Sequence, residues 1–265
     1  MLAPITKADS PLVADLFPSP NIEPRLNGLK PSILVLHYTG LPTVERALDV
    51  LSRVDCKVSC HYVIDVDGRI IQMVSEELRA WHAGVSYWRG ETDINSASIG
   101  IEIHNPGHAF SYPDFAEVQM QAVERLSRDI IARHRIRPER VLAHSDVAPA
   151  RKRDPGEKFP WEKLAQAGIG HWVAPAPLVE GDEGLTPGAA EPRVAAFQVT
   201  LRRYGYGIEP TGVIDERTEL VVAAFQRHFR PERVDGRIDR STVATLERLL
   251  SSLPADGRQM PRLRV

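Results

Sequence analysis

The chain has 265 residues, of which 43% are hydrophobic and 26% are charged, and its formal net charge at pH 7 is −2. These values are ordinary for a globular protein of one large or two smaller domains, and they give no electrostatic reason to expect nucleic acid binding. No apolar stretch is long enough to predict a membrane span, and residues 1–20 lack the features of a secretory signal. We therefore expect a cytoplasmic protein, or else the mature form of an exported one.

The first predicted strand, residues 32–38, ends in a histidine. Four consecutive aliphatic residues precede His37 and indicate that the strand is buried. A side chain at the end of such a strand is held rigidly and faces the loops where functional sites are usually built. A single histidine there can equally be a hydrogen-bonded core residue. A helix follows up to Arg53, with Thr43 as its N-cap.

Residues 58–66 and 69–74 are predicted to form a hairpin around the tight turn at residues 67–68. Cys56 and Cys60 would share one face of the first strand but lie too far apart to form a disulfide, so we expect free thiols. A zinc site that uses Cys60 and His61 is the alternative for this stretch.

Residues 79–90 are rich in aromatic residues and glycine, and they show no helix or strand period. The stretch predicts a long loop whose large amphipathic side chains either line a groove for a polar ligand or only fix the loop itself. The next predicted strand, residues 98–104, carries Glu102 among isoleucines. Because a buried carboxylate is costly unless it is paired or used in chemistry, Glu102 is a candidate functional residue.

A long helix is predicted from Asp114 to His134, with Asp114 and Glu117 as a capping box. A short strand follows and ends in a second histidine, His144, as the first strand ended in His37.

The segment after His144 contains further candidates. Asp154 stands before Pro155 and Gly156, where the backbone is restricted. Two imidazoles and one carboxylate are three ligands of the kind that a catalytic zinc binds while its fourth position stays open to water. Asp146 is either another ligand or a residue that orients a ligand or braces the loop. Lys152 is either a surface charge or a cation that faces a reacting carbonyl.

Several motifs in this order resemble the zinc-dependent N-acetylmuramoyl-L-alanine amidases of the AmpD/AmiD type, which are grouped with the peptidoglycan recognition proteins and the T7 lysozyme-like amidases. The motifs are Leu36-His37-Tyr38, the strand and turn around His61, and residues 79–84, 98–102 and 144–156. The resemblance covers residues 18–173. It implies an α/β fold for residues 1–173, with a mixed β-sheet flanked by helices and zinc in a groove on one face.

The resemblance also implies roles for individual residues. His37, His144 and Asp154 match the zinc ligands, Glu102 matches the general base, and Lys152 matches the cation near the carbonyl oxygen. Cys60 stands where some relatives carry a catalytic tyrosine, which gives Glu102 more weight. An aspartate as third ligand, where the recognition proteins have cysteine, indicates the bacterial amidase branch.

The implied reaction is hydrolysis of the amide bond between N-acetylmuramic acid and L-alanine, in peptidoglycan or in anhydromuropeptides, for cell-wall turnover or recycling. Lys57, Arg79 and Arg89 are candidates to pair with carboxylates of the stem peptide. Trp81, His82 and Trp88 are candidates to line the groove. The alternative function is a non-catalytic protein that binds or senses peptidoglycan fragments, which a broken ligand set would favour.

The composition changes at residues 174–191, where many breakers and few hydrophobic residues indicate a linker. In residues 192–255 the pattern Gly-x-Ile-Asp occurs at Gly212 and again at Gly236, each time with an aspartate able to cap a following helix. We predict a small three-helix bundle that resembles the peptidoglycan-binding domain of wall hydrolases. Alternatively, it only packs on the amidase domain. A bundle that binds the cell wall favours a periplasmic location, whereas the absence of a signal sequence favours the cytoplasm, and we expect the cytoplasm. No feature of the sequence predicts the oligomeric state.

Overall fold

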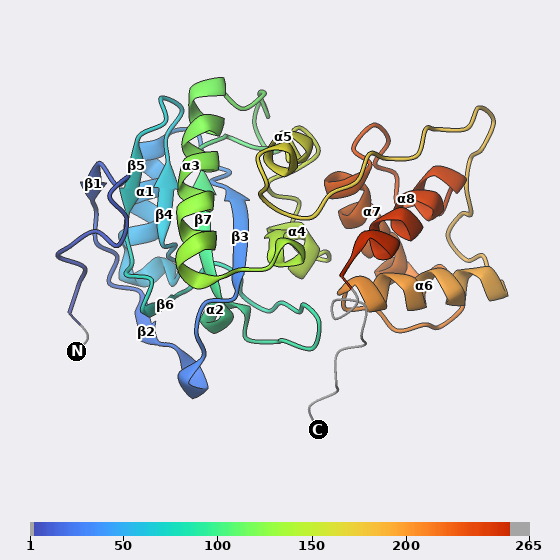
Figure 1. The fold of residues 1–265 in the computed structure, drawn as a ribbon, viewed down its shortest axis with the longest axis horizontal. Helices are drawn as coiled ribbons and strands as arrows, with labels where there is room; N and C mark the ends of the chain where they lie inside the picture. Colours follow the sequence, from blue (N-terminus) through green and yellow to red (C-terminus); the bar gives the residue numbers. More distant parts are fainter. Residues whose placement is uncertain (1–2, 255–265) are drawn as a thin grey trace.

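The structure, a computed structural model, describes residues 3–254. Figure 1 shows two parts side by side, a sheet with its helices on the left and a three-helix bundle on the right. The outer ends of the two predicted domains, Met1 and Ala255, lie outside the described residues. Within residues 3–254, no helix is both long enough and apolar enough to cross a membrane.

The main sheet is mixed, as the family resemblance implied. Its strands lie in the order β1 (Asp15–Leu16), β5 (Ile70–Gln72), β4 (Tyr62–Ile64), β7 (Ser98–Ile103), β3 (Ile33–Tyr38) and β8 (Val141–Ala143). Every neighbouring pair is parallel except the β4–β5 hairpin. A separate antiparallel pair joins β2 (Ile22–Pro24) to β6 (Leu78–Ala80).

Among the described residues, five helices belong to the sheet domain and three to the bundle. They are α1 (Val44–Ser52), α2 (Ile94–Ala97), α3 (Glu117–His134), α4 (His144–Val147), α5 (Trp161–Gln166), α6 (Pro192–Tyr204), α7 (Glu216–Phe229) and α8 (Arg240–Ser252). Short 3-10 turns cover residues 26–28, 54–56 and 138–140.

Two helix starts test the capping predictions. Thr43 caps α1 as predicted, since its side chain accepts a hydrogen bond from the Arg46 amide. The capping box predicted at Asp114 is wrong, because α3 begins only at Glu117 and no side chain caps it. The Asp114 carboxylate instead lies 3.1 Å from the Lys158 ammonium.

Side chains alternate along β3 and divide the core into two layers. Leu34 and Leu36 pack under α3 with the isoleucines of β7. Ile33 and Val35 point to the opposite face and belong to a different apolar cluster. His37 continues this second alternation, so it lies on the same face as Ile33 and Val35.

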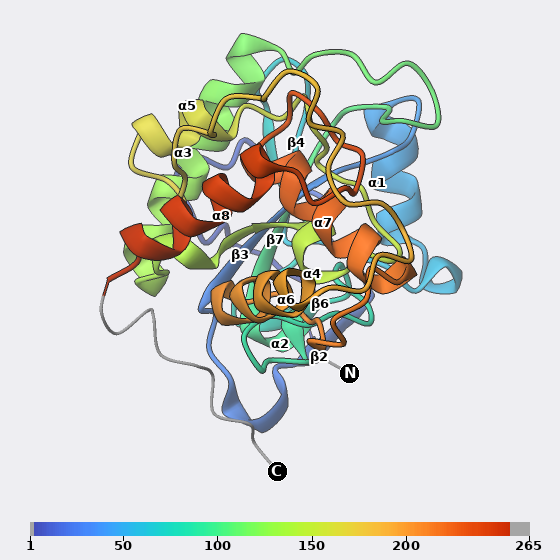
Figure 2. The same ribbon diagram turned by 90° about the vertical axis from the view of Figure 1, so that its right-hand side faces the viewer.

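That second face is covered by two separate elements. At the β4–β5 side, α1 packs on Val63, Ile71 and Met73. At the β3–β8 side, Ile33 and Val35 pack in one continuous cluster with buried residues of α6, α7 and α8. Figure 2 views the molecule from the bundle side, with the bundle in front of the strands. The end of β3 therefore opens between α1 and the bundle.

The internal repeat of the bundle has a physical basis in two buried glutamines. The side-chain amide of Gln198 in α6 donates to the Val213 carbonyl and to Thr218 at the start of α7. Gln226 in α7 makes the corresponding bonds to the Arg237 carbonyl and to Thr242 in α8. Each glutamine thus ties its helix to the next Gly-x-Ile-Asp turn.

The predicted caps of these helices are confirmed. Asp215 accepts from the Thr218 amide at the start of α7, and Asp239 accepts from the Thr242 amide at the start of α8. The segment predicted as a linker lies along the bundle, where Leu185 bridges to Ile238 and Ala190 to Val213.

The two domains share one core. Trp88 from the loop after β6 is fully buried, and its ring lies 5.8 Å from that of Tyr204 and 5.0 Å from that of Tyr206, both measured between centroids. Since the cluster joins the sheet to the bundle, the C-terminal domain is packed on the sheet domain and is not merely connected to it by a flexible linker.

A chain that ends at residue 175 should lose stability, because Ile33, Val35 and Trp88 would lose their cover. Exposure of each large apolar side chain costs about 1.5–3 kcal/mol. The sum over the shared cluster is comparable with the whole stability of a domain, about 5–15 kcal/mol. We expect a lower melting temperature by circular dichroism and strong binding of a hydrophobic dye. An unchanged melting temperature would contradict the shared core.

Candidate metal centre

Three residues distant in the sequence meet at one end of the sheet. His37 lies near the end of β3, and His144 follows the adjacent parallel strand β8. Asp154 reaches them from the loop after α4, where Gly156 adopts a φ of 88° and any Cβ would collide with the Tyr112 hydroxyl. Within residues 3–254, this is the one group of three or more His, Cys, Asp or Glu whose ligand atoms converge.

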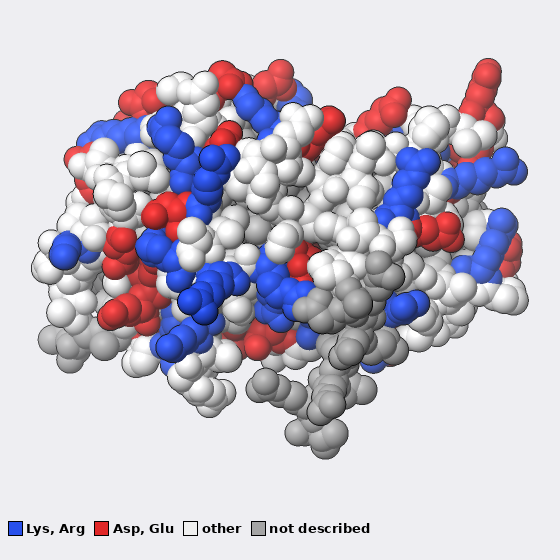
Figure 3. Space-filling model, viewed as in Figure 1, with Lys and Arg blue, Asp and Glu red and all other residues white. Residues whose placement is uncertain are grey.

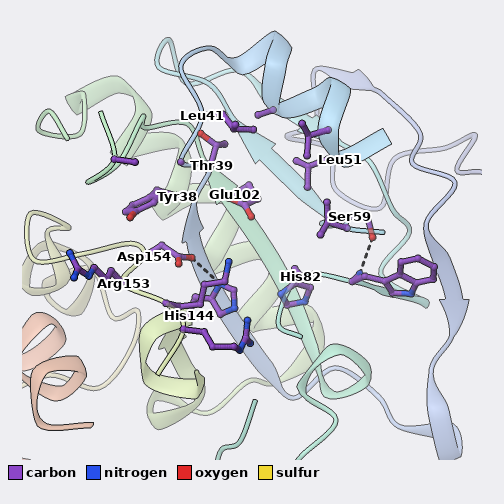
Figure 4. A pocket seen from close by; sticks show the side chains of 18 of the residues that line it. Tyr38, Thr39, Leu41, Leu51, Ser59, His82, Glu102, His144, Arg153 and Asp154 are labelled. Atoms are coloured by element: carbon purple, nitrogen blue, oxygen red, sulfur yellow. Dashed lines mark hydrogen bonds and ion pairs between the residues drawn. The ribbon is translucent and has the colours of Figure 1, made fainter. Parts of the chain in front are cut away.

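The three facing atoms are close to one another. The Nδ1 atoms of His37 and His144 lie 2.8 Å apart. The Oδ2 atom of Asp154 lies 3.1 Å from His37 Nδ1 and 2.9 Å from His144 Nδ1. Figure 4 shows His144 and Asp154 side by side at the cavity. All three residues are at most 5% exposed, so they face one another away from bulk water.

A chain of hydrogen bonds fixes the orientation of His37. The Ser98 hydroxyl donates to the Ile94 carbonyl at 2.5 Å, so it accepts from His82 Nε2 at 3.1 Å. His82 Nδ1 is then the acceptor for His37 Nε2, which lies 3.0 Å away. The structure makes room for His82 at Gly100, where a Cβ would collide with the imidazole ring. His37 therefore presents the lone pair of Nδ1 to the other two ligands.

His144 has the same orientation for a similar reason. Its Nε2 atom lies 3.3 Å from the carbonyl oxygen of Ala83 and donates to it, which leaves Nδ1 free to bind a metal. The Arg151 guanidinium donates to the same carbonyl at 2.9 Å. Both imidazoles are thus oriented by partners on the side away from Asp154.

Charge states fit the same arrangement. Burial, helped by the neighbouring His144, lowers the pKa of His37 to about 4, so its imidazole is neutral at pH 7. Burial alone would raise the pKa of Asp154, but His144 and His37 outweigh this effect and lower it, so the carboxylate is ionised. Two imidazoles and one carboxylate are a donor set that suits zinc.

Glu102 lies directly beside His37 on the neighbouring strand. The two residues are partners in the β3–β7 register, and Oε1 of Glu102 lies 4.0 Å from His37 Nδ1. Its other oxygen, Oε2, is buried and has no hydrogen-bond partner among the described residues. Burial, reinforced by the charge of Asp154, raises the pKa of Glu102 well above its usual value. A largely buried carboxyl that has one oxygen without a partner and a raised pKa is typical of catalytic groups.

These groups lie at a cavity of about 600 Å³. Lys152 lines this cavity. Its positive charge is close enough to Glu102 to offset part of the rise in the pKa of Glu102 that burial and Asp154 cause. Figure 3 shows that both signs of charge are interspersed over one face of the molecule. Further lining residues come from α1, the loop after β6 and the loop after α4, among other segments; they include Ala47, Leu51, Trp81, His82, Arg151 and Arg153.

The cavity rim also contains residues that sequence reasoning missed. His108 lies in a Pro-Gly loop and is not among the residues predicted from the sequence, yet it lines the cavity. Its Nε2 lies 3.1 Å from Glu157, so Nδ1 accepts from the Tyr38 hydroxyl at 2.9 Å. Since Glu157 lies three residues after Asp154, these hydrogen bonds connect the loop that carries Asp154 to Tyr38 at the end of β3. No spacing in the sequence predicts this role of His108.

The predicted substrate contacts divide into two groups. Trp81 and His82 line the cavity. Lys57 is exposed next to the lining residue Val58. Arg79 is not free for a substrate, since its guanidinium lies 2.5 Å from Glu23 and 3.3 Å from Asp93.

Two of those predictions are wrong. Trp88 does not line a groove, because it is fully buried against Tyr204 and Tyr206. Arg89 turns to the bundle, where its guanidinium donates to the Tyr204 carbonyl and its backbone amide to the Gly205 carbonyl, both at 2.9 Å. The aromatic loop therefore has two roles. Trp81 and His82 face the cavity, and Trp88 and Arg89 contact the bundle.

The alternative zinc site at Cys60 and His61 is also wrong. His61 uses both ring nitrogens inside the fold, since Nδ1 accepts from the Gly100 amide at 3.0 Å and Nε2 lies 3.1 Å from the Leu78 carbonyl. Both cysteines are free thiols, as predicted. Asp146 is no ligand either, because its carboxylate accepts hydrogen bonds from the Ala143 amide, Tyr206 and His228.

Comparison with known proteins agrees with the geometry. The family model described as N-acetylmuramoyl-L-alanine amidase matches residues 27–157, and that of a peptidoglycan binding domain matches residues 190–246. The N-acetylmuramoyl-L-alanine amidase AmiD of Escherichia coli (strain K12) is 40% identical over 236 residues, which are 84% of each chain. The 1,6-anhydro-N-acetylmuramyl-L-alanine amidase AmpD of Salmonella typhimurium (strain SL1344) is 35% identical over 56% of this chain and 86% of its own.

Solved structures agree over both domains. The complex of E. coli AmiD with anhydro-N-acetylmuramic acid-L-Ala-D-gamma-Glu-L-Lys superposes with a TM-score of 0.73 at 37% identity, over 89% of this chain and 94% of that one. AmpDh3 from Pseudomonas aeruginosa has a TM-score of 0.74 at 35% identity, over 88% of this chain and 96% of that one. This chain therefore belongs to the N-acetylmuramoyl-L-alanine amidase family and carries a C-terminal peptidoglycan-binding domain.

Proposed function

We propose that this enzyme uses zinc, bound by His37, His144 and Asp154, to hydrolyse the amide bond between N-acetylmuramic acid and L-alanine in anhydromuropeptides and related wall fragments. The observation that carries the proposal is the convergence of these three ligand atoms next to the unpaired carboxyl of Glu102. The substrate class is supported by the relatives, since AmiD was solved with an anhydromuropeptide and AmpD is described as a 1,6-anhydro-N-acetylmuramyl-L-alanine amidase.

The chain's own residues have distinct tasks in this proposal. Zinc supplies Lewis acidity for the amide carbonyl and lowers the pKa of water bound to it. Glu102 takes the proton of the attacking water and delivers it to the leaving amine of L-alanine. Its position beside His37 and its lack of any other partner support this role. Lys152 stabilises the negative charge that develops on the carbonyl oxygen.

A non-catalytic sensor is the competing function, and the site favours it less. A protein that only binds fragments has no use for a carboxyl oxygen that is buried without a partner beside a complete ligand set, because such an oxygen costs stability. The location in the cytoplasm stays a prediction from the sequence.

Removal of the metal tests the proposal directly. After dialysis against a chelator, the protein should release no stem peptide from anhydromuropeptide, as followed by chromatography with mass detection. One equivalent of zinc should restore the activity, whereas magnesium should not, because imidazole ligands suit zinc and magnesium prefers oxygen. Release that is indifferent to chelation would discard the zinc mechanism.

Glu102→Gln should lower kcat by about 10²–10⁴-fold, the usual contribution of general acid–base catalysis. The amide keeps the size of the side chain, so the zinc content measured by plasma emission should stay at one per chain. Glu139→Gln is the matched control, since Glu139 is 4% exposed but pairs with Arg137 and does not line the cavity. A kcat loss below tenfold for Glu102→Gln would remove Glu102 from the mechanism.

We further propose that the bundle binds peptidoglycan, as its family match suggests. The bundle has a groove of about 560 Å³ lined by α6, α8 and the segment before α6, with Arg193 and Arg240 at its edge. Asp182, Asp239 and Glu247 line the groove as well, so charges of both signs stand beside its apolar floor. Such a mixed lining suits a glycopeptide, which carries both amide and carboxylate groups.

Ala196→Trp should weaken binding to insoluble peptidoglycan, because Ala196 is exposed and lines this groove. Val199→Trp is the control, since Val199 is exposed on the same helix but does not line the groove. Both variants are compared by co-sedimentation of the full chain at several wall concentrations. Equal pelleting of the two would argue against the groove as the binding site.

A further inference from the structure

The one-turn helix α4 carries the ligand His144 and is buried between the sheet and the bundle. Asp146, two residues after His144, is fully buried in this turn. An ionised carboxylate in such a position requires hydrogen-bond partners that fully satisfy its oxygens. The identity of these partners determines what holds the turn in place.

Two of the three partners of Asp146 come from the C-terminal bundle. The Tyr206 hydroxyl donates to Oδ1 at 2.6 Å, and Nδ1 of His228 donates to Oδ2 at 2.7 Å. The third partner is the backbone amide of Ala143, which donates to Oδ2 at 2.8 Å. Because Ala143 directly precedes His144, the carboxylate fixes the backbone on both sides of the ligand.

The bundle residues are themselves held rigidly. Tyr206 is fully buried beside Trp88, with ring centroids 5.0 Å apart. His228 is 2% exposed, and its ring stacks between Trp161 at 3.7 Å and Phe229 at 3.8 Å. Neither donor can follow a displaced Asp146 without breaking this packing, so the bundle defines the position of α4.

A second route from the bundle reaches the same ligand. The carbonyl of Gly205, next to Tyr206, accepts from the Arg89 amide at 2.9 Å, and the Tyr87 amide donates to the Val147 carbonyl of α4 at 2.9 Å. These contacts hold the loop that provides the Ala83 carbonyl, the partner of His144 Nε2. The bundle therefore fixes the backbone of His144 through Asp146, and it fixes the imidazole through the loop that carries Ala83.

We propose that the C-terminal bundle is a structural part of the metal centre, in which Tyr206 and His228 act through Asp146 as positioning residues for the ligand His144. The inference rests on the proposed function, because it takes His144 as a zinc ligand. Partners that orient a metal ligand change metal affinity by about 10–100-fold when they are lost. A role in stability alone would leave the affinity of the folded protein unchanged.

Tyr206→Phe tests the inference, and Tyr204→Phe is the matched control. The Tyr204 hydroxyl is equally buried and also bonds across the domains, to His171 Nδ1 at 2.9 Å, but it does not contact Asp146. The full-length proteins are compared for zinc affinity by chelator competition, for the absorption spectrum of the cobalt form, and for the melting temperature without metal.

We expect Tyr206→Phe to weaken zinc binding about tenfold or more and to alter the cobalt spectrum. Tyr204→Phe should lower the melting temperature of the metal-free protein comparably, while its zinc affinity stays within about twofold of wild type. His228→Phe is the second variant, because it keeps a ring stacked against Trp161 and removes only the donor; it should behave like Tyr206→Phe.

Equal zinc affinities and cobalt spectra for wild type, Tyr206→Phe and His228→Phe would overturn the inference while the proposed function stands. Wild-type protein that binds no zinc would overturn both. The same loss of affinity in Tyr204→Phe would also overturn it, since the effect would then follow from any weakened contact between the domains.

Discussion

The two-residue period of side chains along β3 is the constraint on which the site depends. It sends Leu34 and Leu36 under α3, and it sends Ile33, Val35 and His37 to the opposite face. A strand shifted by one residue would bury His37 under α3 and expose its neighbours. Because α1 covers one side of that second face and the bundle covers the other, a cavity remains at the end of β3, lined by Tyr38, Glu102 and His144, where substrate can enter.

The site also explains a local cost in the fold. Glu102 is held on β7 with one oxygen that has no partner, which is unfavourable for folding alone. The same isolation gives a general base no competing hydrogen bonds, so the carboxyl is available to the reacting water. Long-range hydrogen bonds hold the neighbouring imidazoles of His37 and His144. The unfavourable free energy is therefore confined to Glu102, while the two histidines keep their hydrogen-bond partners.

Much of this was accessible from the sequence. Residue types at strand ends identified His37 and His144, the buried position identified Glu102, and the repeated Gly-x-Ile-Asp pattern identified the bundle. These features depend on local periodicity, which a sequence carries directly. Asp154 was a ligand candidate because the following Pro155 and Gly156 restrict its backbone, but only the family resemblance selected it over Asp146. The function of Lys152 also came from that resemblance, because a loop residue has no periodic signal.

Other features depend on contacts between distant segments and could not be predicted. An aromatic loop looks the same whether it lines a groove or joins two domains, and only the bundle decides that Trp88 and Arg89 do the latter. The role of Asp146 was left open between ligand and brace, and its partners Tyr206 and His228 lie 60 and 82 residues away. The choice of Nδ1 on both histidines likewise depends on His82 and Ala83.

The most direct test of the account is a crystal structure of the zinc-loaded protein, with anomalous scattering recorded on both sides of the zinc edge. The account predicts one strong peak bonded to Nδ1 of His37, Nδ1 of His144 and a carboxylate oxygen of Asp154, with zinc–nitrogen distances of about 2.0–2.1 Å. A peak elsewhere, or coordination through Nε2 of either histidine, would contradict it.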